Sequence, residues 1–176
     1  MLNRAISARI KQAINGERKV IIIYGPRQSG KTTLIKFLLA DMGKEYEYFT
    51  GDDLYAQSIF GKNELESLKR ILKNDIIVVD EAQKIENIGL SLKLIFDNLP
   101  MKVIASGSAS FDLANKLNEP LTGRTKTFWL YPLAYSELEE KYRKTPPAIS
   151  LEEMLRFGMY PKAHILENDK EKENYL

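Results

Sequence analysis

Two short apolar runs, Val20–Tyr24 and Ile76–Val79, interrupt a chain in which polar and apolar residues otherwise alternate at helical spacing. A continuous run of β-branched residues is typical of a strand buried on both faces of a parallel sheet. We predict strands over both runs, and three further strands where the apolar signal is weaker. The five expected strands are Lys19–Tyr24, Glu45–Phe49, Ile76–Asp80, Lys102–Ser106 and Thr125–Tyr131.

Between these strands, apolar residues recur at the three- and four-residue intervals of an amphipathic helix. The expected helix faces carry Ile6, Ile10, Ala13 and Ile14; Leu34, Phe37, Leu38 and Met42; Leu65, Leu68 and Leu72; and Leu92, Ile95 and Leu99. Helix ends are predicted at Gly16, Gly43 and Pro100, a capping box at Asn63 with Glu66, and a short helix from Ser110 through Leu117. Strands alternating with helices predict an α/β fold, a doubly wound, mostly parallel five-stranded sheet flanked by helices.

The chain divides into a core, residues 1–142, and a remainder, residues 143–176. The segment Tyr142–Ser150 contains two consecutive prolines and is predicted to be a linker. The part from Leu151 onward is helix-prone and then highly charged. A charge run of this kind is typical of a solvated helix face. We therefore expect the start of a C-terminal helical segment there, not a second complete domain.

The amino-acid composition limits the kinds of site that this chain can form. Lys and Arg (26) nearly balance Asp and Glu (24), leaving a net charge of +2, which gives no support for nucleic acid as a partner and does not exclude it. Cysteine is absent and His164 is the single histidine, which removes disulfides, Cys-based zinc sites and His clusters. No apolar run approaches the roughly 20 residues of a membrane span, so we expect a cytoplasmic protein without a membrane segment.

The segment after the first predicted strand fits the pattern G-x-x-x-x-G-K-[ST], which marks a phosphate-binding loop. Its residues are Gly25, Pro26, Arg27, Gln28, Ser29, Gly30, Lys31 and Thr32. Glycines let backbone N–H groups converge on phosphate oxygens, and the following helix N-terminus adds partial positive charge. Lys31 would bridge the β- and γ-phosphates and the Thr32 hydroxyl would ligate Mg²⁺. The side chain of Arg27 lies on the variable part of the loop, where it contacts the ligand or points away.

The second apolar strand delivers two carboxylates, Asp80 and Glu81, at its carboxyl end. In a doubly wound sheet that end opens onto the ligand crevice. We expect Asp80 to hold Mg²⁺ and Glu81 to orient or deprotonate an attacking water as a general base. Either residue could instead cap the following helix. A glutamate at this position favours hydrolysis over phosphorylation of a small molecule.

Two serines and one arginine are further candidates for catalysis. Ser106 and Ser108 leave the fourth predicted strand, where a hydroxyl could bond the attacking water or the γ-phosphate; a helix cap is the alternative. Arg124 follows Gly123 just before the last strand. Its guanidinium could stabilise charge on the transferred phosphoryl group, in cis or from a neighbouring subunit, or form a structural salt bridge.

Together these segments resemble the AAA-type P-loop ATPase domain of prokaryotic ATP-binding proteins that carry a C-terminal domain of unknown function. The resemblance rests on Tyr24–Leu34, Val79–Gln83, Ser106–Ser110, Leu121–Arg124, Tyr131–Glu137 and Phe157–Pro161. Two positions depart from the family pattern: Ser106 stands where threonine is common, and Met159 replaces a second glycine.

The resemblance implies a P-loop NTPase sheet of the AAA+/RecA-like type. It implies ATP and Mg²⁺ as cofactors, held by a phosphate-binding segment that extends to Thr33, with metal contacts from Thr32 and Asp80. It adds support for Glu81 as the water-activating residue, for Ser106 and Ser108 as sensors and for Arg124. Family members are commonly longer, so an attached C-terminal domain is expected to be missing, and a homo-oligomer is compatible with the resemblance.

The leading hypothesis is thus an Mg-dependent ATP-hydrolysing domain that moves an attached domain or partner. A nucleotide-dependent binding switch with little or no hydrolysis is the main alternative. A GTPase is less favoured, because Asn115–Asn118 lacks the final aspartate of the guanine-reading motif. A small-molecule kinase would need an acceptor pocket, of which the sequence gives no sign.

Overall fold

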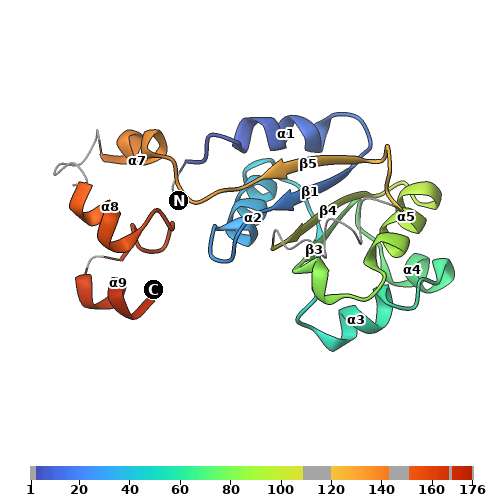
Figure 1. The fold of residues 1–176 in the computed structure, drawn as a ribbon. Helices are drawn as coiled ribbons and strands as arrows, with labels where there is room; N and C mark the ends of the chain where they lie inside the picture. The colour runs from blue at the N-terminus through green and yellow to red at the C-terminus, as the bar shows by residue number, and fades with distance from the viewer. Residues whose placement is uncertain (1–2, 109–119, 143–150, 167, 176) are drawn as a thin grey trace.

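The computed structural model describes residues 3–108, 120–142, 151–166 and 168–175, and Figure 1 shows their arrangement. Five strands form one sheet in the order β2-β3-β4-β1-β5, and every neighbouring pair runs parallel. The strands are β1 (Val20–Tyr24), β2 (Glu47–Thr50), β3 (Ile76–Asp80), β4 (Lys102–Gly107) and β5 (Thr125–Trp129). The predicted fold class, a parallel five-stranded α/β sheet flanked by helices, is confirmed.

Helices cover both faces of this sheet (Figure 1). The helices that cover it are α1 (Ser7–Asn15), α2 (Lys31–Asp41), α3 (Leu54–Phe60), α4 (Leu65–Ile71) and α5 (Ile88–Asn98), and the 3₁₀ turn η1 (Ala82–Lys84) follows β3. The other helices, α7 (Tyr135–Tyr142), α8 (Leu151–Phe157) and α9 (Asp169–Tyr175), lie to one side, away from the sheet (Figure 1). Ile21 and Ile23 of β1 pack with α1 and α2, whereas Val20, Ile22 and Tyr24 pack with α3, α4 and α5. Both faces of β1 are buried, which explains why its sequence is apolar without alternation.

The parallel arrangement brings the carboxyl ends of β1, β3 and β4 to one edge of the sheet. In the strand registers, Tyr24 of β1 lies beside Gly107 of β4, and Asp80 of β3 lies beside Thr50 of β2. The residues that follow these strands therefore meet at the same edge, which is where ligands bind in open α/β sheets.

Several local predictions were wrong. The helix α3 was not predicted, because Leu54 and Tyr55 on it are exposed and break the apolar pattern. Phe37 was expected on the buried face of α2, but 44% of its surface is exposed. The last strand ends at Trp129, two residues before the predicted end.

The predicted capping box at Asn63 was also wrong. Asn63 adopts a left-handed backbone (φ 55°) and its side-chain amide donates to the Gly61 carbonyl at 2.9 Å. The helix α4 instead has Glu64 at its N-cap position. An asparagine tolerates the left-handed conformation and bonds its own backbone nearby, so it forms the turn before the cap.

Other predictions lie outside the described residues: the helix from Ser110 through Leu117, the segment Asn115–Asn118 and most of the linker Tyr142–Ser150. The division between residues 1–142 and 143–176 stays a prediction. Within the part of the chain that the structure describes, none of the helices has the length and apolarity that crossing a membrane requires.

Candidate functional site

The loop between β1 and α2 turns tightly. Two of its residues, Gln28 (φ 65°) and Gly30 (φ 91°), adopt left-handed conformations. A Cβ atom at Gly25 would lie 2.2 Å from the Leu130 carbonyl oxygen, so only glycine fits where the loop leaves β1. Ser29 is fully buried within the loop, whereas Arg27 is exposed.

Lys31 opens α2 with its side chain folded back over the loop. Its ammonium group donates to the carbonyl oxygens of Gly25 (3.0 Å) and Pro26 (2.9 Å) and is 5% exposed. Burial lowers the pKa of Lys31, and the negative charges of Glu81 and Asp80 act in the opposite direction. The cation thus lies directly against the loop, which holds it by two backbone carbonyls.

Asp80, at the end of β3, is 3% exposed and accepts four hydrogen bonds. The Tyr48 hydroxyl (2.8 Å) and the Thr32 hydroxyl donate to its Oδ2 atom. The Ser106 hydroxyl and the Glu81 backbone N–H (3.0 Å) donate to its Oδ1 atom. Burial alone would raise the pKa of Asp80, but these hydrogen bonds together hold it below its ordinary value. The side chain is therefore an anion in the folded protein at neutral pH.

We expect Asp80 to contribute to acid stability. Because its pKa is lower in the folded chain than in the unfolded chain, its contribution is complete above the unfolded value of about 4 and is lost as pH falls through the folded value. In metal- and nucleotide-free buffer, Asp80→Asn should make the free energy of unfolding fall less steeply with decreasing pH than in wild type. Urea unfolding at a series of pH values measures this. The exposed Asp75→Asn is the matched control, and equal slopes for Asp80→Asn and wild type would contradict the assignment.

Glu81 follows Asp80 with a left-handed backbone (φ 48°), which turns the chain sharply after β3. The Gln83 side-chain amide donates to its Oε2 atom at 2.5 Å. A Cβ atom at Gly51 would lie 2.3 Å from the Glu81 carbonyl oxygen, so the loop after β2 presses closely on this turn. The half-buried carboxylate is thereby fixed at the edge of the site.

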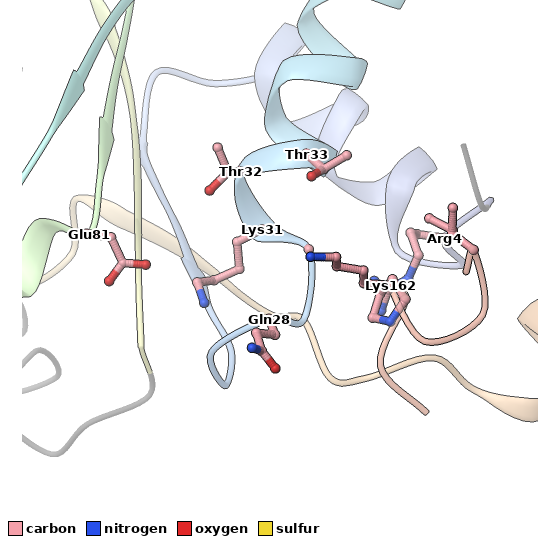
Figure 2. A pocket seen from close by; sticks show the side chains of 10 residues that line it. Arg4, Gln28, Lys31, Thr32, Thr33, Glu81 and Lys162 are labelled. Carbon is pink, nitrogen blue, oxygen red and sulfur yellow. The ribbon is translucent and has the colours of Figure 1, made fainter. Parts of the chain in front are cut away.

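Lys31 and Glu81 border a cavity of about 540 Å³, a size typical of small-ligand sites, and Asp80 lies behind its lining residue Thr32. The lining residues from the loop, α2 and the turn after β3 are Gln28, Gly30, Lys31, Thr32, Thr33 and Glu81, and those from the two ends of the chain are Arg4, Pro161, Lys162 and Ile165. In Figure 2, Lys31 extends from the loop toward the space in front of Glu81, while Arg4 and Lys162 lie at the other side of the loop. The cavity therefore joins the loop to segments from both ends of the chain.

Magnesium would have to share its ligands with a nucleotide. Among the residues that the structure describes, no three or more carboxylate or histidine side chains gather into a group that could hold a metal. Thr32 and Asp80, which are hydrogen-bonded to each other, supply two hard oxygen ligands. This donor set fits Mg²⁺, which is commonly bound by one or two carboxylates together with substrate phosphates and water.

The structure brings most of the predicted site residues together. Ser106 is fully buried and reaches Asp80, and Ser108 lies two residues farther along, just beyond the end of β4. Arg124 lies elsewhere. Its backbone carbonyl accepts from the N–H of Val20, at the amino end of β1, and its guanidinium pairs with Asp97 at 2.8 Å. Because the loop is at the opposite end of the sheet, Arg124 does not reach the cavity of its own chain.

Three residues that contact the predicted site residues were not predicted from the sequence. Tyr48 lies within the predicted strand Glu45–Phe49, and Gln83 lies within the segment Val79–Gln83, but the sequence indicated no role for either side chain. Arg4 carried no sequence signal, since a lone arginine in a polar segment is usually solvated. Its guanidinium nevertheless reaches the Ser29 carbonyl at 2.9 Å.

Comparisons with known proteins agree with the observed fold. A family model described as an AAA domain matches residues 17–139. Among solved structures, a Walker-type ATPase of Pyrococcus abyssi is similar with a TM-score of 0.62 and 17% identity, over 93% of this chain and 65% of that one. A katanin structure concerned with self-assembly has a TM-score of 0.58 and 15% identity, over 89% and 63%. Comparison with curated proteins gives no match.

A third similar structure is the Orc1 protein of Aeropyrum pernix in complex with DNA, with a TM-score of 0.54 and 14% identity, over 88% of this chain and 53% of that one. At such identities the likeness shows the fold alone. The chain spans less than two thirds of the length of each of these three structures.

Proposed function

Because the chain belongs to the AAA domain family, whose model matches most of its length, we propose that it binds ATP with Mg²⁺ and hydrolyses it. In this proposal the turnover drives a conformational change of an attached domain or partner. The observation that carries it is the convergence of four side chains on one edge of the sheet: Lys31, Thr32 and Glu81 line one cavity, and Asp80 is hydrogen-bonded to Thr32.

Each of these side chains has a distinct part in the proposed chemistry. The loop N–H groups and the start of α2 bind the phosphates, and the Lys31 ammonium neutralises the β- and γ-phosphate oxygens. Thr32 and Asp80 would hold the Mg²⁺ ion, which would polarise the phosphates. Glu81 orients the attacking water and accepts its proton. Ser106 keeps Asp80 in place, and Ser108 stays a candidate for contact with the γ-phosphate.

A single-turnover experiment tests hydrolysis directly. Excess chain is mixed with Mg–ATP, and the release of inorganic phosphate is followed over time. The proposal predicts release of one phosphate per bound ATP. Binding of ATP without phosphate release would favour the nucleotide-dependent switch instead. In a competition assay with labelled ATP bound to the chain, stronger displacement by GTP than by unlabelled ATP would favour a GTPase.

Arg124 is proposed to act in trans, as an arginine supplied to the cavity of a neighbouring copy. Arg124 lies at the far end of its own sheet and does not reach the cavity of its own chain, so it could act only on the cavity of another copy. The katanin structure with a similar fold concerns self-assembly, which supports a homo-oligomer here.

We expect Arg124→Ala to slow hydrolysis by about 10³-fold or more with little change in ATP affinity, because a guanidinium near the transferred phosphoryl group acts mainly in the transition state. Wild-type activity per chain should rise with protein concentration, and steady-state phosphate release over a dilution series measures this. Arg9→Met is the control. A concentration-independent rate together with an unaltered Arg124→Ala rate would remove Arg124 from the mechanism.

A further inference from the structure

Arg4, which precedes α1, is a buried arginine in contact with the phosphate loop. It is 6% exposed and lines the cavity beside Gly30. One guanidinium nitrogen, Nη1, donates to the Ser29 carbonyl of the loop at 2.9 Å, and Nη2 donates to the Tyr131 carbonyl at 2.6 Å. Arg4 thus joins the loop to the chain that leaves β5.

The third contact of Arg4 is with Glu137 on α7. Its Nε atom lies 3.3 Å from Glu137 Oε1, and the two side chains are 5% and 9% exposed. The same carboxylate accepts from the backbone N–H of Ala5 (2.7 Å) and of Ala134 (2.9 Å). Both carboxylate oxygens of Glu137 therefore accept hydrogen bonds, which compensates for the cost of burying its negative charge.

The connection from β5 to α7 also contacts the start of the phosphate loop. Leu130 donates from its N–H to the Tyr24 carbonyl at 2.7 Å, and its own carbonyl lies against Gly25, where a Cβ atom would clash. Farther along, the Leu133 N–H donates to the Met159 carbonyl at 2.7 Å, and Leu133 and Leu138 pack against Met159. The loop, α7 and the turn after α8 are thus linked by direct contacts.

We propose that Arg4 is a positioning residue that couples occupancy of the phosphate loop to helix α7 through Glu137. The proposal rests on the nucleotide binding proposed above. A loop that closes on phosphates fixes the Ser29 carbonyl, which fixes Arg4, and the buried ion pair then fixes the start of α7. Coupling of this kind is reciprocal. If a bound nucleotide stabilises α7 by some free energy, then the intact contact with α7 strengthens nucleotide binding by the same free energy.

Hydrogen exchange on the wild-type chain tests the coupling without any variant. Backbone exchange is measured by mass spectrometry with and without Mg²⁺ and a non-hydrolysable ATP analogue. We expect exchange to slow in two segments, Gly25–Thr33 and Leu133–Leu138, the second by about tenfold. Slower exchange in Gly25–Thr33 alone would overturn the coupling. No change in Gly25–Thr33 would contradict nucleotide binding itself, so the two failures are distinguishable.

Variants then test the part of Arg4. Arg4→Met alone leaves the buried Glu137 carboxylate without its cation, so the double variant Arg4→Met/Glu137→Gln, which removes both charges, is the main test. With the analogue bound, it should still slow exchange in Gly25–Thr33 and no longer in Leu133–Leu138, and its affinity should be about tenfold weaker. Arg9→Met, an exposed arginine on α1, should behave as wild type. Retained slowing at Leu133–Leu138 in the double variant would overturn the proposal.

Discussion

Replacing Lys31 with alanine is expected to weaken the binding of Mg–ATP by about 10- to 150-fold. The ammonium group is the buried cation of the loop, and a hydrogen bond to a charged group contributes about 1.5–3 kcal/mol. Its removal leaves the β- and γ-phosphates without a counter-charge, while the carbonyls of Gly25 and Pro26 lose only a donor. A fluorescence titration with a labelled ATP analogue measures the change in dissociation constant.

The control for this substitution is Lys44→Ala, an exposed lysine just beyond α2. Circular dichroism and a thermal unfolding curve establish that each variant is folded before it is titrated. Equal dissociation constants for Lys31→Ala and wild type would mean that the loop does not bind phosphate through this side chain.

Replacing Glu81 with glutamine is expected to leave Mg–ATP binding almost unchanged and to slow hydrolysis by about 10²- to 10⁴-fold, the usual contribution of a positioned general base. An amide keeps the shape of the side chain and its contact with Gln83, but it cannot accept a proton from water. We therefore expect the substitution to lower the rate constant of a single turnover and to leave the dissociation constant of Mg–ATP almost unchanged.

Glu86→Gln, an exposed residue on the same connection between β3 and α5, is the matched control and should hydrolyse ATP at the wild-type rate. Phosphate release under single-turnover conditions compares the three chains. A Glu81→Gln rate within twofold of wild type would assign water activation to another group.

The strands and the loop could be predicted because local sequence determines them. Ile21 and Ile22 point to opposite faces of a doubly covered sheet, so β1 is apolar throughout, and the G-x-x-x-x-G-K-[ST] spacing is itself the geometry of the loop. The parallel order then placed Asp80 and Glu81 at the same edge as Lys31. These are the residues that the structure brings together.

The supporting contacts could not be predicted, because they join residues far apart in the chain. Arg4 meets Glu137 across 133 positions, and Tyr48 meets Asp80 across 32, which no periodicity records. The close approach of Gly51 to Glu81 is likewise a property of packing between two loops. The sequence left Arg124 open between contact with the transferred phosphoryl group and a structural salt bridge. Only the fold places it at the far end of the sheet, where it pairs with Asp97.

Isothermal titration calorimetry of the wild-type chain with ATP, in buffers with and without Mg²⁺, tests the central claim most directly. The account predicts saturable binding of one nucleotide per chain that is tighter with the metal than without it. Absence of any binding heat at several temperatures, in a chain shown to be folded, would contradict it.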